Sequence, residues 1–232
     1  MKFKIKHDDF DFLRQYEEEN VSFVNIIAGS GSLSVEVIKE NNSIVYRMPA
    51  EVSSTGSIFV VLNKLIGMMN LFEDDVVFEY NGSPDKELLE LSGKSDNIKI
   101  SLICWSEMPK AIVVSWLGEQ HPLFELNEDK EVFDKYVKSI KSFVNKNKTF
   151  IIGFSTNKEI YLENGARSYS NVSKIDELFF SRDTKLLYEK IKSGGEITNI
   201  IVSPEVIEFC FSDCNIFCKC EKVIGPIISS VL

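Results

Sequence analysis

The chain has 232 residues, of which 44% are apolar and 26% charged, proportions that are ordinary for a folded globular protein. Lys and Arg number 26 against 35 Asp and Glu, so the formal net charge is -9. A negative field opposes non-specific binding to nucleic acid and to anionic lipid, because both present phosphate. We therefore expect protein partners, no direct nucleic-acid contact and no membrane association.

The amino-terminal residues 1–7 are charged and lack the apolar run of a secretory signal. No window approaches the roughly 18 consecutive apolar residues of a membrane-spanning helix. Five cysteines without a signal favour reduced thiols rather than a disulfide framework. These features predict a soluble, cytoplasmic protein.

The first part of the chain begins with an acidic helix over residues 8–20, in which apolar residues recur at helical spacing. Three strands separated by turns follow at 21–28, 33–38 and 43–48. This order predicts a β-meander after the first helix.

A second helix is predicted to begin near Ser53–Thr55, which can cap its amino terminus. Ile58, Leu62 and Leu65 recur at helical spacing, but residues 59–61 are apolar as well, so we expect this helix to be covered on both sides. Gly67 lowers helix propensity, and a close packing contact would explain its presence.

The clearest hairpin of the sequence joins residues 97–105 to residues 110–117. Both of its faces are apolar at the centre, so both require cover. The helices of the chain could supply that cover. Alternatively a partner protein could, with Trp105 or Trp116 as the anchor, since Trp is enriched at interface hot spots.

A third helix begins near Asn127 and carries an apolar stripe with lysines on its other face. The polar run 145–148 marks a boundary between a domain of residues 1–147 and a smaller one of residues 148–232, the second being possibly continuous with the first. In the second half a helix is predicted over residues 182–192, stopped by Gly194 and Gly195. Both halves therefore have the order strands, helix, strands, although no residue-level repeat is visible. We therefore predict an α+β fold with largely antiparallel sheets and three main helices.

Four of the five cysteines lie close together near the carboxyl terminus. If residues 213–215 form a three-residue hairpin loop, Cys210 pairs with Cys218, and Cys220 lies on the same sheet face. With Cys214 nearby, these thiols could bind zinc. The spacing differs from the paired C-x2-C of common zinc sites, and free cysteines also pack as small apolar groups, so core packing is the alternative.

No catalytic residue is predicted. The only histidines, His7 and His121, have no nucleophile motif beside them. Residues 29–32 contain two glycines but lead into a strand, whereas a phosphate-binding loop leads into a helix. The sequence therefore predicts no cofactor other than the zinc considered above.

The leading functional hypothesis is an acidic protein-binding module, such as an inhibitor or immunity-type protein that occludes a basic partner. In this hypothesis six acidic residues steer the partner: Glu17, Glu18, Glu19, Glu73, Asp74 and Asp75. Two alternatives remain open, namely a metal- or thiol-dependent enzyme centred on the carboxy-terminal cysteines and a structural subunit of a homo-oligomer.

Overall fold

The computed structural model describes residues 1–17, 23–39, 42–82, 88–93, 99–105, 121–164, 168–170 and 177–224. Half of these residues are in strands and 23% are helical. All the strand pairs with a defined register are antiparallel, as predicted, but a balanced α+β fold with three main helices is wrong. Antiparallel sheet dominates, and the described residues contain four helical segments. No described helix is long and apolar enough to span a membrane.

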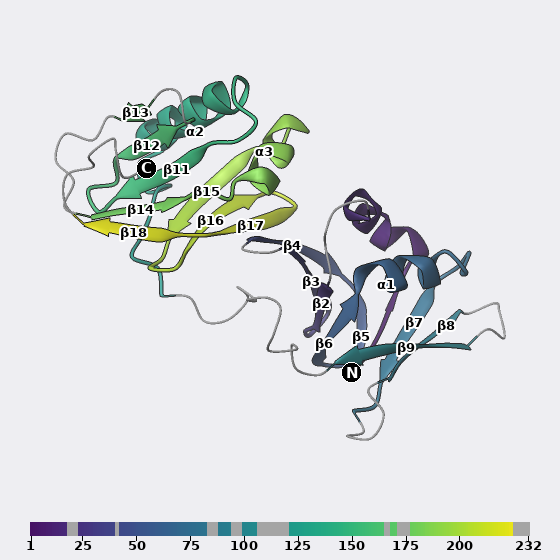
Figure 1. Cartoon of the computed structure of the whole chain (residues 1–232). Coiled ribbons are helices and arrows are strands. Elements are labelled where there is room, and N and C mark those ends of the chain that lie inside the picture. Colours follow the sequence, from purple (N-terminus) through teal and green to yellow (C-terminus); the bar gives the residue numbers. More distant parts are fainter. Residues whose placement is uncertain are drawn as a thin grey trace. The chain divides into compact units, whose positions relative to one another are not determined.

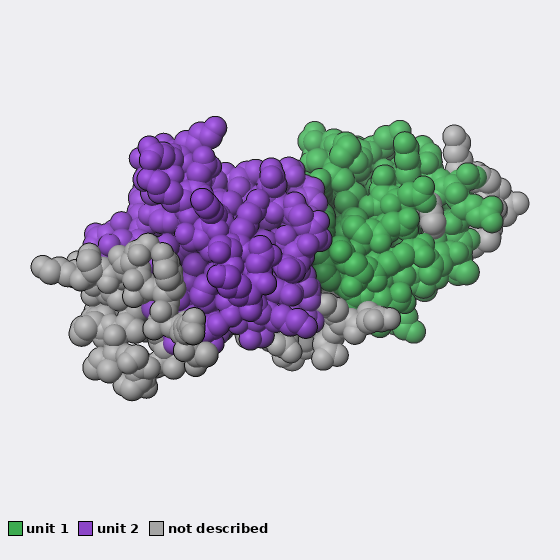
Figure 2. Space-filling model, turned by 90° about the horizontal axis from the view of Figure 1, so that it is seen from above, with its two compact units in different colours: residues 1–40, 45–115 green, residues 41–44, 116–232 purple. Residues whose placement is uncertain are grey.

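The chain divides into two compact units, coloured separately in Figure 2. Unit 1 comprises residues 1–40 and 45–115, and unit 2 comprises residues 41–44 and 116–232. The predicted boundary at residues 145–148 falls inside unit 2, at the end of a helix. That polar run ends a helix rather than linking two domains.

Unit 1 contains a ten-residue 3-10 helix, η1 (His7–Tyr16), and a short helix, α1 (Leu62–Met69). Its strands are β1 (Lys2–Ile5), β2 (Phe23–Ala28), β3 (Ser32–Lys39), β4 (Asn42–Pro49), β5 (Glu51–Ser54), β6 (Gly56–Val61), β7 (Val76–Tyr80), β8 (Leu88–Gly93) and β9 (Lys99–Trp105). They follow one another in the order β4-β3-β2-β6-β9-β8-β7-β1-β5.

Unit 2 contains the longest helix, α2 (Lys130–Val144), and α3 (Lys185–Lys192). Its strands are β10 (Phe124–Glu125), β11 (Ile151–Ser155), β12 (Ile160–Glu163), β13 (Ser168–Ser170), β14 (Glu177–Ser181), β15 (Ile197–Val202), β16 (Val206–Phe211), β17 (Cys214–Lys219) and β18 (Glu221–Ile224). Within this unit they form two runs, β10-β15-β16-β17 and β13-β12-β11-β14-β18.

The element order reveals a fourfold repeat of one strand, one helix and three strands (Figure 1). In unit 1 the repeats are β1-η1-β2-β3-β4 and β6-α1-β7-β8-β9, with β5 between them. In unit 2 they are β10-α2-β11-β12-β13 and β14-α3-β15-β16-β17, followed by β18. Each unit is therefore a structural duplication that the residues themselves do not show.

The two repeats of each unit exchange their first strands. In unit 1, β1 pairs with β7, the first meander strand of the second repeat, and β6 pairs with β2 of the first repeat. Unit 2 repeats this rule, because β10 pairs with β15 and β14 pairs with β11. Neither repeat is complete without the other.

The helices of each unit lie next to each other, η1 beside α1 and α2 beside α3. Their apolar stripes are buried: Phe10, Leu13 and Tyr16 of η1; Leu62, Leu65, Ile66 and Met69 of α1; Phe133, Ile140 and Val144 of α2; Leu186, Leu187 and Ile191 of α3. In unit 1 the core includes Phe3 stacked on Phe78, with ring centroids 4.7 Å apart. Each unit thus buries one face of a helix pair in its core.

The predicted helix over residues 53–69 begins later than expected. Residues 56–61 form β6 between β2 and β9, and only Leu62–Met69 are helical. A strand covered on both faces has the same continuous apolar run as a buried helix, and β-branched and aromatic residues favour the strand.

The predicted Trp hairpin is described only in its first strand. Strand β9 lies between β8 and β6, and β6 pairs with it at Cys104 and Trp105. The predicted second strand, residues 110–117, lies outside the described residues, so this hairpin stays a prediction. The described hairpin of this region is therefore β8–β9.

Two glycines provide a matched test of packing in this fold. A Cβ at Gly153, on β11, would lie 2.8 Å from both the carbonyl oxygen of Phe179 and the Cβ of Phe180, so Gly153→Ala should destabilise the protein by about 2 kcal/mol. A Cβ at Gly67 would meet nothing within 4 Å, contrary to the close contact that we expected there. Gly67→Ala should therefore stabilise α1 by about 1 kcal/mol. Urea unfolding of both variants measures the two changes, and equal effects would contradict the packing described.

Candidate nucleic-acid interface

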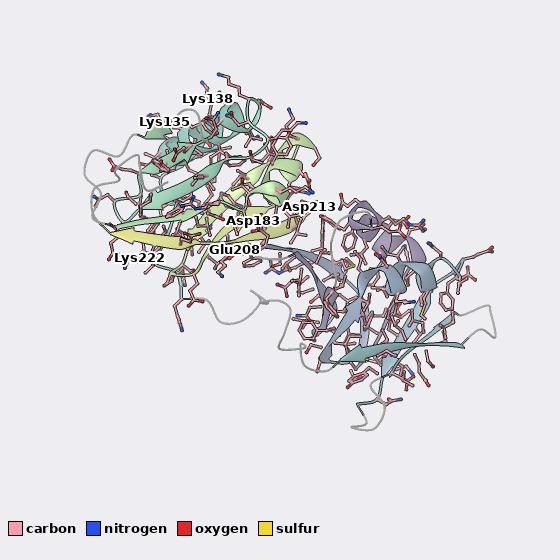
Figure 3. All side chains as sticks on the ribbon, in the orientation of Figure 1. Lys135, Lys138, Asp183, Glu208, Asp213 and Lys222 are labelled. Atoms are coloured by element: carbon pink, nitrogen blue, oxygen red, sulfur yellow. The ribbon has the colours of Figure 1, made fainter. Side chains whose placement is uncertain are left out.

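Helix α2 carries four lysines, more than any other described element of unit 2. Asp129, rather than the expected Asn127, is its N-cap, and its side chain accepts a hydrogen bond from the Val132 N–H at 3.2 Å. Because Phe133, Ile140 and Val144 face the core, the lysines between them are directed outwards. Figure 3 shows Lys135 and Lys138 on this outer side of α2, and Lys222 of β18 on the other side of the unit.

The helix pairs of the two units differ in charge. Helices α2 and α3 together contain seven lysines and three carboxylates, a net charge of +4. Helices η1 and α1 together contain Arg14 and Lys64 against three aspartates, a net charge of -1 with histidine neutral. The only strongly basic helix surface among the described residues therefore belongs to unit 2.

Several lysines of unit 2 are neutralised by neighbouring carboxylates. Lys135 lies 2.8 Å from Glu131, and Lys190 lies 2.6 Å from Asp213. Burial alone would raise the pKa of Asp213, but the hydrogen bond and positive charge of Lys190 outweigh it and hold this pKa below its usual value. Within α2 and the turn after it, four lysines form no ion pair with any described residue: Lys130, Lys138, Lys146 and Lys148.

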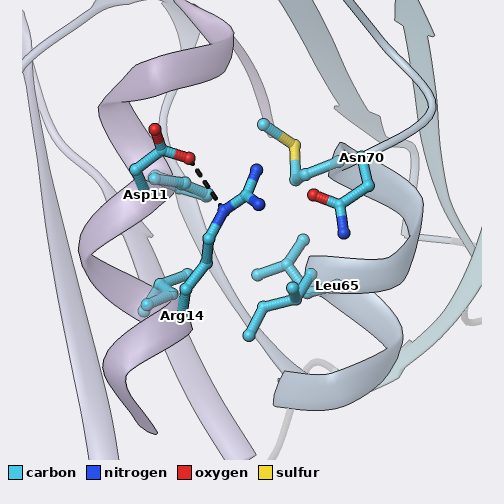
Figure 4. A pocket seen from close by; sticks show the side chains of 8 residues that line it. Asp11, Arg14, Leu65 and Asn70 are labelled. Atoms are coloured by element: carbon cyan, nitrogen blue, oxygen red, sulfur yellow. Dashed lines mark hydrogen bonds and ion pairs between the residues drawn. The ribbon is translucent and has the colours of Figure 1, made fainter. Parts of the chain in front are cut away.

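The helix pair of unit 1 encloses only a small groove. Figure 4 shows Arg14 of η1 reaching towards Asn70 at the end of α1, with its Nε 2.9 Å from Oδ1 of Asp11. The cavity there has a volume of about 10 Å³, no more than a single water requires. This groove is closed by apolar packing and offers no room for a ligand.

The structure describes four of the six acidic residues predicted to steer a partner, whose role stays a prediction. Glu17 follows η1 and is exposed, as are Glu73 and Asp74 in the turn after α1. Asp75 is half-buried and forms an ion pair with Lys4 at 2.7 Å, so its negative charge is already balanced within the chain. Glu18 and Glu19 lie outside the described residues.

The tryptophans proposed as anchors remain predictions. Trp105 ends β9, where its backbone pairs with Phe59, and Trp116 lies outside the described residues. The exposed apolar residue of β9 is Ile103, whose side chain is 62% exposed.

The cysteine hairpin has a different register from the one assumed. Phe209 pairs with Ile216 and Cys210 with Asn215, which leaves a two-residue loop at Ser212–Asp213. Cys218 then pairs with Ile207 on the core face, while Cys210 lies on the opposite face. The arrangement on which the zinc prediction depended is not formed, and the described residues contain no group of three metal-ligating side chains.

The buried thiols of this hairpin are poor nucleophiles. Burial raises the pKa of Cys214 to about 12 and that of Cys220 to about 12, and it also raises the pKa of Cys218. The thiolate is the reactive form of cysteine, so these groups stay protonated at neutral pH. Cys210 is half-buried, and its sulfur lies 3.8 Å from Oε1 of Glu208.

Comparison with solved structures identifies the fold. The chain is similar over its whole length to the beta subunit from DNA polymerase of Streptococcus pyogenes, with a TM-score of 0.64, 13% identity and 67% of that chain covered. It is also similar in structure to the DNA polymerase III subunit beta from Pseudomonas aeruginosa, with a TM-score of 0.61 and 12% identity, and the match covers 100% of this chain and 68% of that one. For the DNA polymerase sliding clamp from Caulobacter crescentus the TM-score is 0.59, with 15% identity, 98% of this chain and 66% of that one.

The fold is therefore that of sliding clamps, and the chain spans about two thirds of the length of these clamp chains. The prediction of an inhibitor or immunity-type protein is wrong, because the structural neighbours are DNA clamps. No family model matches the chain, and no curated protein matches it in sequence.

Sequence reasoning placed lysines on the outer face of this helix but drew no function from them, because it weighed the net charge of the whole chain. The signal lay in residues 130–148, which contain six lysines and two carboxylates. Counting charge for each predicted element would have separated this basic helix from the acidic surroundings.

Thiol labelling tests the cysteine arrangement. In the native protein we expect one thiol, that of Cys210, to react readily with a disulfide reagent, because Cys104, Cys214, Cys218 and Cys220 are buried. The other four should react only after unfolding, and Cys210→Ser should remove the rapid phase. Rapid reaction of two or more thiols in the native protein would contradict this arrangement.

Proposed function

We propose that this chain is the subunit of a DNA clamp, a ring that surrounds duplex DNA and keeps a partner protein on it. The observation that carries the proposal is the sliding-clamp fold along the whole chain. A ring that encloses DNA needs an inner surface that tolerates DNA and subunits that assemble into a closed oligomer. It needs neither a catalytic residue nor a cofactor.

The charge distribution supports contact between DNA and the helix pair of unit 2. Lysines on α2 and α3 can approach phosphate, whereas the acidic remainder of the chain repels it. This reverses our expectation that the protein makes no direct nucleic-acid contact, because that expectation rested on the net charge of -9. A local basic face within an acidic protein orients DNA towards one surface.

The proposal also requires several copies of the chain. The chain has two structural units and spans about two thirds of each clamp chain that it resembles, so we propose that a ring is closed by a homo-oligomer. A DNA-acting enzyme is the natural class of protein partner, since the similar structures are subunits of DNA polymerases. The oligomer and the partner together would keep that enzyme on its template.

Retention on circular DNA tests the enclosure. Protein assembled in the presence of nicked circular plasmid should co-elute with the plasmid in gel filtration at physiological salt and should be released when a restriction enzyme linearises it. Light scattering of the free protein should give a multiple of the subunit mass of 26.4 kDa. A monomer, or equal retention on circular and linear plasmid, would contradict the proposed ring.

Replacement of surface lysines tests the DNA-facing surface. The double variant Lys130→Gln with Lys138→Gln should weaken duplex binding and reduce the salt dependence by about two units of log–log slope, because each lost phosphate contact accounts for about 0.9. The matched control replaces Lys219 and Lys222, which are exposed on or beside strands β17 and β18, with glutamine. Fluorescence anisotropy at several salt concentrations compares them, and an equal effect of both doubles would exclude α2 as the specific contact.

A further inference from the structure

A cavity of about 340 Å³ lies beside α2, on the side that faces β12. Its lining comes almost entirely from one edge of the helix and the turn that follows it, and its floor includes one residue of β12: the residues are Lys138, Ser139, Ser142, Phe143, Lys146 and Leu162. This volume is within the range of small-ligand sites. The whole cavity belongs to unit 2.

The polar groups of the cavity are ordered along the helix. Lys138 and Ser142 are four residues apart and lie in one row on α2, and Lys146 follows two residues after the helix ends at Val144. Ser139 and Phe143 form the adjacent row. Two cations therefore flank two hydroxyl groups at the mouth of one hollow.

The two lysines are free to bind an anion. Neither Lys138 nor Lys146 forms an ion pair with a described residue, whereas Lys135 and Lys190 are neutralised. The comparable cavity of unit 1, about 380 Å³ in volume, differs because three carboxylates, those of Asp9, Glu51 and Asp75, line it beside its lysines. Its Lys4 is held by Asp75 at 2.7 Å and lies 3.8 Å from Glu51.

The floor of the cavity is apolar and partly aromatic. Phe143 is half-buried, and its ring is held by an edge contact with Phe150, with centroids 6.1 Å apart and an interplanar angle of 69°. Leu162 is buried beneath it. A fixed aromatic ring between two unpaired lysines combines stacking with charge, as in sites that bind single-stranded nucleic acid.

We infer that this cavity binds a nucleotide unit of single-stranded nucleic acid, with phosphates at Lys138 and Lys146 and a base against Phe143. A duplex presents phosphates but keeps its bases stacked inside, so it would touch the lysines and leave the hollow empty. An acidic peptide with an aromatic side chain has related chemistry, but two lysines that accompany one aromatic ring favour a nucleic-acid strand, which carries a phosphate on each side of every base. This inference goes beyond enclosure of duplex DNA and does not depend on a ring.

Binding of a short fluorescein-labelled oligothymidylate, compared with an abasic strand of equal length, tests the site. The wild-type protein should bind the oligothymidylate about tenfold more tightly than the abasic strand, because stacking on an aromatic side chain contributes that much per base. Phe143→Leu keeps an apolar side chain of similar size, and it should remove this difference. Lys138→Gln and Lys146→Gln should weaken both strands, and the exposed control Lys148→Gln should weaken them much less.

Three outcomes would overturn the inference: equal wild-type affinity for both strands, an unchanged preference in Phe143→Leu, or stronger displacement by an acidic aromatic peptide than by oligothymidylate. Circular dichroism of each variant confirms that it is folded. Retention of Phe143→Leu on nicked circular plasmid separates this site from the proposed clamp function. Loss of base preference with normal retention supports the site, whereas failure of retention in the wild type contradicts only the clamp.

Discussion

The exchange of first strands between repeats is the constraint on which each unit depends. A single repeat has one strand, one helix and a three-stranded meander, and its first strand pairs with the first meander strand of the other repeat. In unit 1 this exchange also fixes the amino terminus, since the Met1 amino group donates to the carbonyl oxygen of Tyr80 at 2.7 Å. Unpaired strand edges are costly, so two repeats must fold together.

This exchange brings the two helices of each unit side by side, because each helix follows directly after an exchanged strand or the short loop behind it. The core then needs only the inner stripe of each helix, and the outer faces are free to vary in charge. In unit 1 the outer faces are slightly acidic, whereas in unit 2 they are basic. The same architecture can therefore present different surfaces without changing its core.

Most of the local structure followed from sequence pattern, but the topology did not. The helix α2 with its buried stripe and the strand β3 were predicted correctly, since such patterns are read within one element. Residues 56–61 were assigned to a helix because a doubly covered strand has no polar face to reveal its period. The register of the cysteine hairpin depends on its loop, which has two residues and not the three that were assumed. The pairing is therefore shifted by three residues, and because three is an odd number, Cys210 and Cys218 lie on opposite faces.

The duplication was hidden for a physical reason: hydrogen bonds between strands constrain the backbone, and any apolar residue of suitable size satisfies the inner positions. The same freedom allows a sliding-clamp fold at 12–15% identity. The candidate interface was hidden because the net charge sums all residues, whereas binding depends on local groups. To predict a binding surface, the charges on the outer face of a single helix therefore have to be counted. The apolar stripe of that helix shows which face is the outer one.

The lysines of unit 2 are too few to hold DNA by charge alone. Lys135, Lys141 and Lys190 lie near carboxylates, which leaves four lysines of α2 and its following turn to meet phosphate. Contacts of this number and kind give weak binding that salt weakens further. Weak contact suits a protein that must move along its template, because each strong contact would have to break at every step. Persistence on DNA would then come from closure of the ring, and the acidic remainder of the chain would keep other surfaces away from phosphate.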